Sequence, residues 1–407
     1  MYDVLIIGAG AAGLFAAVHC GRFGKKTAVI EKNDIQGKKL LITGKGRCNV
    51  TNNCDVETVL KNIPTNPRFM YSAVNSCTPE DVMNFFEWSG VPLKTERGNR
   101  VFPESDKSSD IVSALVRECR EAGVEFIRDK ALELIIENGE AKGVKCLNES
   151  YYAEKILVAT GGKSYPKTGS TGDGYEFAKQ AGHTVIKASP SLVPIVTKEK
   201  YASEMMGLSL RNVTLSVYKN SEQKPIFKEQ GELLFTHFGV SGPLVLSASS
   251  HIRNCENGEY RLLIDMKPAL DSETLDKRIL RDFTEAKNRD FQNSLGKLLP
   301  SKMIPVIVNL SGIDGAKKVN EITRTERKSL AELIKNFPLT VKCFRPIDEA
   351  IITSGGVSVK EINPKTMESK LVKNLFFAGE VIDVDAYTGG FNLQIAFSTA
   401  YAFAVNA

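Results

Sequence analysis

Three glycines close to the start of the chain have the spacing of a phosphate-binding turn. Gly8, Gly10 and Gly13 follow the pattern GxGxxG, and the acidic residue Glu31 stands about twenty residues further on. The first glycine of this pattern permits a tight turn, the second lets the backbone approach a pyrophosphate, and the third lets a helix pack closely on a strand. The acid accepts hydrogen bonds from ribose hydroxyls. The spacing predicts a dinucleotide site made by Gly8, Gly10, Ala11, Ala12, Gly13 and Glu31.

A second candidate segment, residues 37–52, is rich in glycine and basic residues. The backbone N–H groups around Gly44, together with Arg47, can reach a phosphate or an electron-rich ring. Asn49 and Thr51 can hydrogen-bond the edge of a heterocycle. The composition does not fit a regular element, so we expect a loop that wraps around a ligand. An ordered surface loop without a ligand is the alternative.

A third candidate lies near the C-terminus. Residues 374–380 have the pattern of a short strand that ends in Gly379 and Glu380, and Gly389 and Gly390 open a final apolar helix. The positive end of that helix dipole favours negative charge, such as the charge of a reduced flavin ring. We therefore expect this second glycine turn to bind the cofactor as well.

The elements around the first glycine turn predict how it is positioned. Residues 3–7 are apolar like a buried parallel strand, an apolar helix runs through Cys20, and residues 27–30 form a second strand that ends at Glu31. This order is a βαβ unit with the glycine turn after its first strand. Residues 156–162 predict another buried strand that ends in a glycine turn.

The middle of the chain has a different pattern. From residues 189–194 to about Met266, short runs alternate between apolar and polar residues, which predicts antiparallel strands. Residues 271–299 and 328–336 have helical periodicity, and strand and turn signals return at Thr353. The sequence thus predicts an α/β fold in which an antiparallel insert interrupts a discontinuous cofactor domain.

Length and composition set the broad class. A chain of 407 residues predicts two or three domains, and its 53 basic and 48 acidic residues give a net charge of +5 without a basic run of five or more. Eight cysteines without a CxxC pair predict no metal site and free thiols in a reducing cytoplasm. No apolar stretch reaches the ~18 residues of a membrane span. We expect a cytoplasmic protein without membrane or nucleic-acid partners.

Two further patterns limit the chemistry. No second GxGxxG occurs, so the sequence predicts no separate nicotinamide domain. Residues 239–243 lack the final glycine of the GxSxG motif, which argues against a serine hydrolase.

Taken together, these motifs resemble the BaiN/YhiN-like family of FAD-dependent oxidoreductases, which belong to the two-dinucleotide-binding-domain flavoproteins. The matching stretches are residues 8–13, 44–52, 100–103, 159–166, 234–239 and 379–394. The resemblance implies a Rossmann-like FAD domain, a barrel-like β insert, and a small helical domain within that insert. The expected boundaries are 1–190 with 346–407, 191–268 with 337–345, and 269–336.

The resemblance also implies FAD contacts at matching positions. Glu31 and Lys32 are expected to hold the adenosine end, and Ala131 the adenine. Thr160 and Gly161 are expected on the pyrophosphate side. The ribityl chain and flavin ring are assigned to Asn49, Val50, Thr51, Gly379, Glu380, Asn392, Leu393 and Gln394. Gly44, Arg47 and Gly390 are also expected to contact the cofactor.

Members of the family are associated with reduction of activated double bonds, including bile-acid-like enones, and a divergent branch with amine oxidation. For an ene-reduction, hydride passes from flavin N5 to the β-carbon and an acid protonates the α-carbon. Tyr387 is the first candidate acid and His237 the second, while Arg47 is a candidate for binding a substrate carbonyl. Each residue also has an alternative interpretation. Tyr387 packs on the flavin ring, His237 is a structural histidine in a turn, and Arg47 contacts FAD.

The favoured function is a reductase of a small molecule that takes electrons from NADH or NADPH, bound transiently. A flavin amine oxidase that passes electrons to oxygen is one alternative, and a tRNA-modifying flavoprotein is another. The sequence predicts no oligomeric state.

Overall fold

The computed structural model describes residues 1–252, 255 and 258–407, and it divides into two compact units. The first unit comprises Met1–Ser191 and Pro346–Ala407, and the inserted unit comprises Leu192–Arg345. The predicted fold class is confirmed, because a Rossmann-like α/β sheet is interrupted in sequence by a closed antiparallel barrel with helices.

A seven-stranded sheet forms the centre of the first unit. Its order is β6-β2-β1-β9-β8-β7, and β18 pairs with the second half of β9. The runs in β1 and β2 are buried, as expected for strands covered on both faces. The strands are β1 (Tyr2–Ile7), β2 (Thr27–Glu31), β6 (Glu125–Arg128), β7 (Ala131–Glu137), β8 (Glu140–Cys146), β9 (Ser150–Val158) and β18 (Leu375–Phe377).

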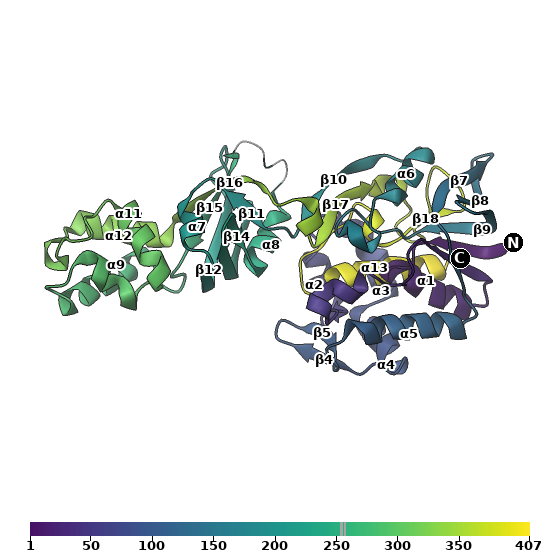
Figure 1. Cartoon of the computed structure of the whole chain (residues 1–407), viewed down its shortest axis with the longest axis horizontal. Coiled ribbons are helices and arrows are strands. Elements are labelled where there is room, and N and C mark those ends of the chain that lie inside the picture. The colour runs from purple at the N-terminus through teal and green to yellow at the C-terminus, as the bar shows by residue number, and fades with distance from the viewer. Residues whose placement is uncertain (253–254, 256–257) are drawn as a thin grey trace. The chain divides into compact units, whose positions relative to one another are not determined.

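Two apolar helices, α1 (Ala11–Arg22) and α13 (Phe391–Ala404), lie side by side in the first unit (Figure 1). Their contact includes Phe15 and Phe397, whose rings are 4.9 Å apart. Because both helices are buried on nearly all sides, they hold two glycine-led N-termini in fixed positions. The other helices here are α2 (Val56–Lys61), α3 (Pro67–Ser76), α4 (Pro79–Trp88), α5 (Ser108–Glu121) and α6 (Asp173–Gln180).

Two small sheets complete the first unit. One has the order β3-β5-β4 and the other pairs β10 with β17. Thr78 caps α4 through a reciprocal capping box with Asp81. The strands are β3 (Thr51–Asn52), β4 (Leu93–Glu96), β5 (Arg100–Pro103), β10 (Val185–Ser191) and β17 (Ile352–Val357).

The inserted unit contains a closed barrel in the order β11-β14-β13-β12-β15-β16. The predicted alternation is found in β12, where Val213, Leu215 and Val217 are buried in the core of this unit. Short helices α7 (Tyr201–Glu204) and α8 (Pro243–Ser249) pack on it. The strands are β11 (Ile195–Thr197), β12 (Ser209–Lys219), β13 (Phe227–Thr236), β14 (Gly239–Ser241), β15 (Tyr260–Asp265) and β16 (Phe337–Phe344).

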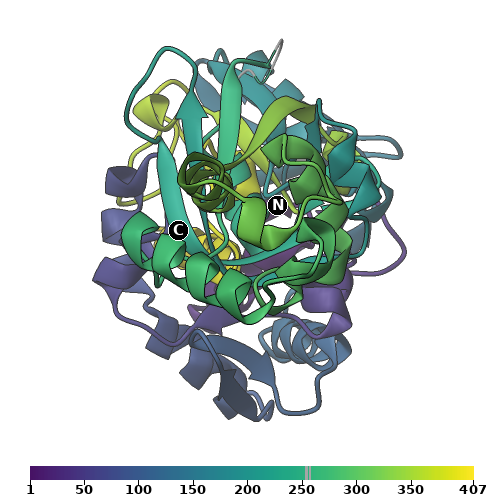
Figure 2. The ribbon, with the colours of Figure 1, turned by 90° about the vertical axis from the view of Figure 1, so that its left-hand side faces the viewer.

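Beyond one end of the barrel lie helices α9 (Ser272–Glu285), α10 (Phe291–Ser294), α11 (Ile304–Ser311) and α12 (Arg324–Lys335), in green in Figure 2. The predicted helical stretch through residues 271–299 is therefore interrupted after Glu285 and resumes as α10 and the 3₁₀ turn Leu295–Lys297. The chain turns between α9 and α10, and Asp290 pairs with Lys318 in a β-bridge and an ion pair of 2.7 Å. Asn288 and Asp290 favour such a turn because both residue types are weak helix formers.

The helices are short. The longest, α5, α9 and α13, have 14 residues each. Over the described ranges, none has both the length and the apolar character needed to cross a lipid bilayer.

Candidate cofactor and active site

The glycine turn before α1 leaves space where a phosphate is expected. Gly8 has φ = 103°, and a Cβ there would lie 2.7 Å from the carbonyl oxygen of Ala159. A Cβ on Gly13 would collide with the carbonyl oxygen of Gly8. A Cβ on Gly10, in contrast, would have no described atom within 4 Å. Gly8 and Gly13 thus serve packing, while Gly10 faces open space at a helix N-terminus whose first N–H groups lack intrahelical acceptors.

Glu31, the last residue of β2, is hydrogen-bonded to the glycine turn. Its Oε2 accepts a hydrogen bond of 2.8 Å from the backbone N–H of Ala9, and its Oε1 accepts two from Asn33. Lys32 donates to Asp173 at 2.5 Å. The backbone N–H of Asp129 donates to the Glu31 carbonyl, so the chain entering β7 at residue 131 passes beside this acid. Ala131, expected at the adenine, therefore lies two residues along the chain from a hydrogen bond to the end of β2.

Buried oxygen atoms near the glycine turn have no hydrogen-bond partner among the described residues. They include Thr160 Oγ1 and the Tyr175 hydroxyl. The Cα of Thr160 lies 3.2 Å from the Cβ position of Gly8, and Gly161 continues the turn with φ = 74°. Burial, followed by the negative charges of Glu380 and Asp383, raises the pKa of Tyr175. Its phenol is therefore a neutral donor at neutral pH.

Glu380 occupies a polar cluster next to α1. A Cβ added to Gly379 would lie 2.9 Å from the Cβ of Ala12 in α1, so the two backbones are in close contact. The Glu380 carboxylate accepts hydrogen bonds from Lys39 Nζ at 2.6 Å, Ser164 Oγ at 3.0 Å and the N–H of Thr353 at 2.9 Å. Burial acts to raise the pKa of Glu380, but Lys39 and the donated hydrogen bonds outweigh it and keep the pKa below its usual value.

The loop predicted to wrap a ligand contains a short 3₁₀ turn, Leu40–Gly46, and backbone in the left-handed region. Gly44 and Lys45 have φ near 60°. Asn49 Oδ1 is buried without a partner among the described residues. Val50 is fully buried, and its N–H donates to Val101 at 2.9 Å. The loop is thus ordered, with one amide oxygen left for a ligand.

Thr51 and Gln394, both expected to hold the flavin, are hydrogen-bonded to each other. Thr51 Oγ1 donates a buried hydrogen bond of 2.6 Å to Gln394 Oε1, and Gln394 Nε2 donates to the carbonyl of Cys77 and to Ser398. Gly390 has φ = 100°, and a Cβ there would collide with the backbone of Thr51. Their side chains thus anchor the start of α13 against β3.

The residues around Tyr387 are held by Asn392. Its Oδ1 accepts from the N–H of Ala386 at 2.9 Å, and its Nδ2 donates to the carbonyls of Ala386 and Tyr387. The N–H of Tyr387 donates to Asn62 at 3.0 Å. Tyr387 is half-buried, and Leu393 packs on the core. The backbone that carries the first candidate acid is therefore fixed.

Arg47 lies in an ion-pair cluster rather than alone. It contacts Glu96 and Asp106, and its guanidinium lies 4.1 Å from the centroid of the Phe102 ring. The hydrogen bonds that Arg47 donates to Glu96 and Asp106 raise its pKa. Arg47 was expected to bind a substrate carbonyl or FAD, and in the structure it contacts Glu96, Asp106 and Phe102.

His237 lies in the inserted unit, on the exposed turn between β13 and β14. Its ring packs 4.9 Å from that of Phe238. Its proposed role in catalysis stays a prediction.

These features fit FAD. The space at Gly10 and the two glycine-led helix N-termini offer room and N–H donors for a pyrophosphate. The unpartnered hydroxyls of Thr160 and Tyr175 add donors, and Asn49 Oδ1 adds an acceptor for a polar chain. The described residues hold no cluster of three or more His, Cys, Asp or Glu that could bind a metal ion.

Sequence reasoning missed Lys39, Ser164, Thr353 and Tyr175. Lys39 lies in the wrapping loop, and Thr353 precedes the double glycine at 355–356, so both stood beside motifs that were already recognised. Their convergence on Glu380 depends on contacts across up to 341 residues, which no local pattern indicates.

Comparison with known families gives a match over nearly the whole chain. Residues 2–406 match the family described as the HI0933-like protein Rossmann domain. A protein of Haemophilus influenzae named ribosomal RNA dihydrouridine synthase is 33% identical over 99% of this chain and 97% of its own length. An Escherichia coli protein of the same name is 32% identical, with the same coverage.

A Clostridium scindens protein named 3-dehydro-bile acid delta(4,6)-reductase is 29% identical over 98% of both chains. Among solved structures, 3-ketosteroid delta1-dehydrogenase from Sterolibacterium denitrificans superposes with a TM-score of 0.49 at 12% identity, covering 100% of this chain and 99% of that chain.

Proposed function

Because this chain belongs to the HI0933-like family of FAD-dependent oxidoreductases, we propose that it reduces a carbon–carbon double bond conjugated to a carbonyl group. The observation that carries the proposal is chemical. A dihydrouridine synthase saturates the C5=C6 bond of uracil, which is conjugated to C4=O, and a delta(4,6)-reductase of a 3-dehydro-bile acid saturates bonds conjugated to the 3-oxo group. Relatives with both names align with nearly all of this chain.

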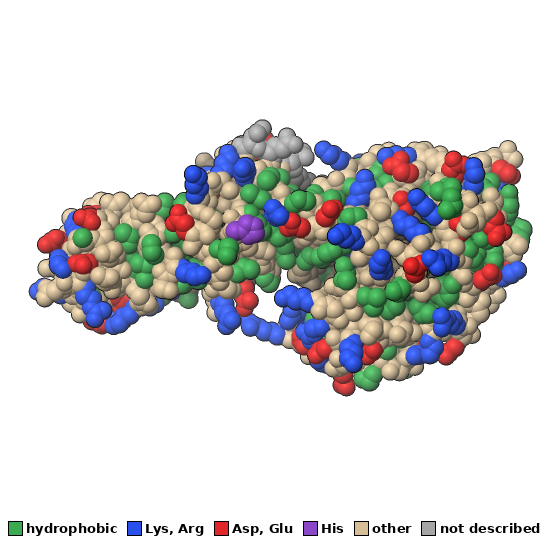
Figure 3. Space-filling model, in the orientation of Figure 1, with side chains coloured by type: hydrophobic (Ala, Val, Ile, Leu, Met, Phe, Trp, Pro, Cys, Tyr) green, Lys and Arg blue, Asp and Glu red, His purple; other side chains and the backbone are tan. Residues whose placement is uncertain are grey.

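We propose a uracil base in RNA as the substrate, because the inserted unit has an excess of basic over acidic residues and the rest of the chain does not. Residues 192–345 contain 24 Lys and Arg against 18 Asp and Glu, whereas the rest of the chain contains 29 against 30. Lys and Arg side chains are spread over both the barrel and the helices of the inserted unit (Figure 3). A positive surface attracts the phosphate backbone irrespective of sequence. This proposal replaces the expectation of no nucleic-acid partner, which rested on the absence of a basic run.

The bound FAD supplies the hydride, and the protein supplies position and a proton. The N–H groups at Gly10 and the carboxylate of Glu380 would hold the cofactor, with Lys39 keeping that carboxylate ionised. Tyr387 is proposed to give a proton to the α-carbon of the reduced bond. Arg47, engaged by Glu96 and Asp106, is proposed to hold the wrapping loop in place.

The test is direct. The purified flavoprotein is first titrated with NADH and NADPH without oxygen, and bleaching of the flavin absorbance identifies the electron donor. Ribosomal RNA transcribed in vitro is then incubated with enzyme and donor, digested to nucleosides, and analysed by mass spectrometry for uridine that has gained two hydrogen atoms. Loss of the product with a Gly10→Val variant would tie it to the bound cofactor.

A second candidate is reduction of a steroid-like enone, favoured by the 29% identical bile-acid reductase. It is tested in the same assay by replacing RNA with a 3-oxo-Δ4 steroid. Turnover of the steroid but not of RNA would select this candidate. If neither nicotinamide bleaches the flavin, the amine-oxidase alternative is tested with amines as donors.

A further inference from the structure

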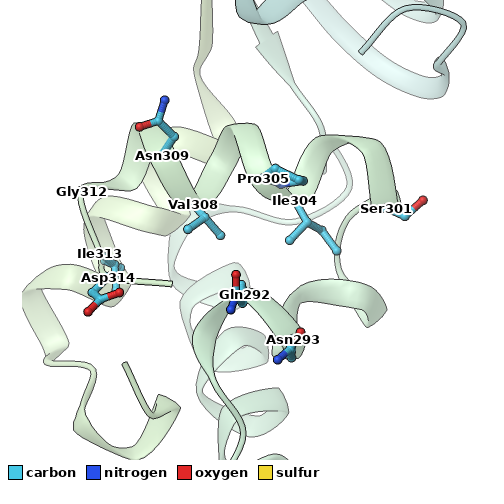
Figure 4. A pocket seen from close by; sticks show the side chains of 10 residues that line it. All are labelled: Gln292, Asn293, Ser301, Ile304, Pro305, Val308, Asn309, Gly312, Ile313 and Asp314. Carbon is cyan, nitrogen blue, oxygen red and sulfur yellow. The ribbon is translucent and has the colours of Figure 1, made fainter. Parts of the chain in front are cut away.

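A pocket of about 820 Å³ lies among the helices of the inserted unit (Figure 4). It is formed by α10, the 3₁₀ turn Ser301–Met303, α11 and the segment that follows Gly312. All of its lining residues lie between 292 and 314. The volume falls within the range of roughly 300–1,000 Å³ that small-molecule sites occupy.

The two sides of the pocket differ in chemistry. Gln292 and Asn293 lie on α10, and Ile304 and Val308 extend toward them from α11 (Figure 4). Both amide side chains are exposed, and within the described part of the chain neither bonds to another protein group. One wall therefore presents free donors and acceptors, and the other presents an aliphatic surface.

The scaffold behind the amides is rigid. The N–H of Gln292 donates to the carbonyl of Gly315 at 3.1 Å, and that of Phe291 donates to Lys317 at 2.9 Å. A Cβ on Gly315 would lie within 3.3 Å of Gln292 Oε1 and Val308. The two backbone hydrogen bonds join α10 to residues 315–317, so backbone contacts set the spacing between the amide side chains and the segment after α11.

Asp314 at one end restricts what the pocket accepts. One of its oxygens accepts the N–H of Ala316 at 3.0 Å, which leaves the other oxygen available. A carboxylate repels a phosphate but accepts hydrogen bonds from ring N–H groups. Amides next to it can donate to carbonyl oxygens and accept from N–H groups. Uracil and guanine carry both kinds of group on one flat edge, and their faces can lie on an aliphatic wall.

Basic residues flank the pocket outside its lining. Lys302 follows Ser301, which lines the pocket, and Arg289 stands three residues before Gln292. Both side chains are exposed, and Lys302 Nζ also donates to the carbonyl of Met206 at 2.8 Å. The surroundings thus suit a phosphate backbone, while the interior suits a base.

We propose that this pocket binds one unstacked nucleobase of the RNA substrate, through Gln292 and Asn293 on its edge and Val308 on its face. The inference rests on the proposed RNA function and adds an anchoring site separate from the base that is reduced. RNA recognition commonly takes this form, because unpaired bases present their edges to amide and carboxylate side chains.

The experiment measures RNA affinity of the FAD-loaded full chain by fluorescence anisotropy. The probes are fluorescein-labelled oligouridylate and an abasic oligomer of the same length, over a series of KCl concentrations. A double variant, Gln292→Ala with Asn293→Ala, should bind oligouridylate about 30-fold more weakly, which corresponds to roughly 2 kcal/mol for two lost hydrogen bonds. The salt dependence should not change, because no phosphate contact is removed.

Matched variants separate the possible causes. Asn288→Ala removes an exposed amide outside the lining and should bind like the wild type. Lys302→Ala should weaken binding of both probes and reduce the salt slope. Gln292→Glu keeps the size of the side chain, adds a like charge beside Asp314 and should also weaken binding.

Wild-type affinity in the double variant, or an equal loss of affinity for the abasic oligomer, would refute the proposal that the pocket binds a nucleobase. Absence of RNA binding by the wild type would refute it together with the proposed substrate. Dihydrouridine formation by the wild type with unaltered binding by the pocket variants would leave the function standing and remove the pocket alone. RNA binding that depends on the pocket, without dihydrouridine formation, would support the pocket and refute the proposed reaction.

Discussion

Thr51 and Gln394 are joined by a buried hydrogen bond of 2.6 Å, although 343 residues separate them in the chain. The bond connects the end of the wrapping loop to the first turn of α13. Gly390, whose Cβ would collide with Thr51, allows the two backbones to come this close. The wrapping loop and the second glycine-led helix N-terminus are therefore held as one structure before any ligand is considered.

Gln394→Leu should destabilise the protein through this contact. The substitution leaves Thr51 Oγ1 without its partner in a buried place, at a cost of about 1–3 kcal/mol, whereas the Cys77 carbonyl keeps the hydrogen bond of 2.8 Å that Ser398 Oγ donates. Chemical denaturation of the apoprotein measures the loss. Thr51→Val in the same background should add little further, because its partner is already gone. Fully additive effects of the two substitutions would contradict the coupling.

Gly10→Val and Gly13→Ala should fail in different ways. The Cβ position of Gly10 has no described atom within 4 Å, so the valine variant should fold and melt like the wild-type apoprotein but retain no FAD. The Cβ of Gly13→Ala meets the Gly8 carbonyl, so this smaller change should lower the melting temperature or prevent folding. Flavin absorbance and thermal melting of both variants decide the matter. Stoichiometric FAD in Gly10→Val would contradict the cofactor placement.

These glycines show what the sequence can predict. The tight turn, close approach and packing follow from residue type and spacing, because a glycine turn between a strand and a helix has few geometries. The alternation around Val213 likewise predicts a strand with one buried face. Such features depend on residues that are near one another in the chain.

Contacts between distant segments were not predictable in the same way. Arg47 meets Glu96 and Asp106 only because β3, β4 and β5 form a sheet, which a single sequence does not reveal. The hydrogen bond between Thr51 and Gln394 likewise joins two motifs that the sequence indicates only separately, and their expected contact with the flavin stays a prediction. The break of the helix after Glu285 depends on a β-bridge from Asp290 to Lys318.

Lys39→Met should make FAD binding sensitive to pH. Without the ammonium group that donates to Glu380 at 2.6 Å, burial dominates and the pKa of this carboxyl rises. The carboxyl then becomes protonated as pH falls, and a neutral acid accepts hydrogen bonds from cofactor hydroxyls poorly. Titration of FAD by flavin fluorescence at a series of pH values should show affinity falling as pH is lowered in the variant, with the fall beginning at a higher pH than in the wild type. Lys39→Arg is the control that keeps the charge.

Tyr387→Phe should bind FAD normally and reduce its substrate ~10²-fold more slowly if the phenol supplies the proton. Flavin bleaching by the nicotinamide should be unchanged, because that half-reaction needs no proton for the α-carbon. Rapid-mixing absorbance separates the two half-reactions. His237→Gln serves as the comparison for the second candidate acid. Unchanged turnover of the phenylalanine variant would remove Tyr387 from the mechanism.

His19 should make the fold less stable in acid. Its ring packs 4.6 Å from Phe15 and 4.8 Å from Tyr401, and burial, followed by the charge of Arg22, lowers its pKa to about 4. In the unfolded chain its pKa is about 6.5, so between these values the unfolded state binds more protons and stability decreases as pH falls. At about 1.4 kcal/mol for each pH unit, the loss approaches ~3 kcal/mol at pH 4.

Urea unfolding at pH 7, 5 and 4, comparing wild type with His19→Phe, tests this effect. The phenylalanine ring fills the same apolar site without a titrating group, so its free energy of unfolding should fall less between pH 7 and 4. His183 is also buried with a lowered pKa, but it is present in both proteins and its contribution cancels in the comparison. Parallel pH profiles for the two proteins would mean that His19 is already protonated in the folded state, and that its aromatic neighbours tolerate the charge.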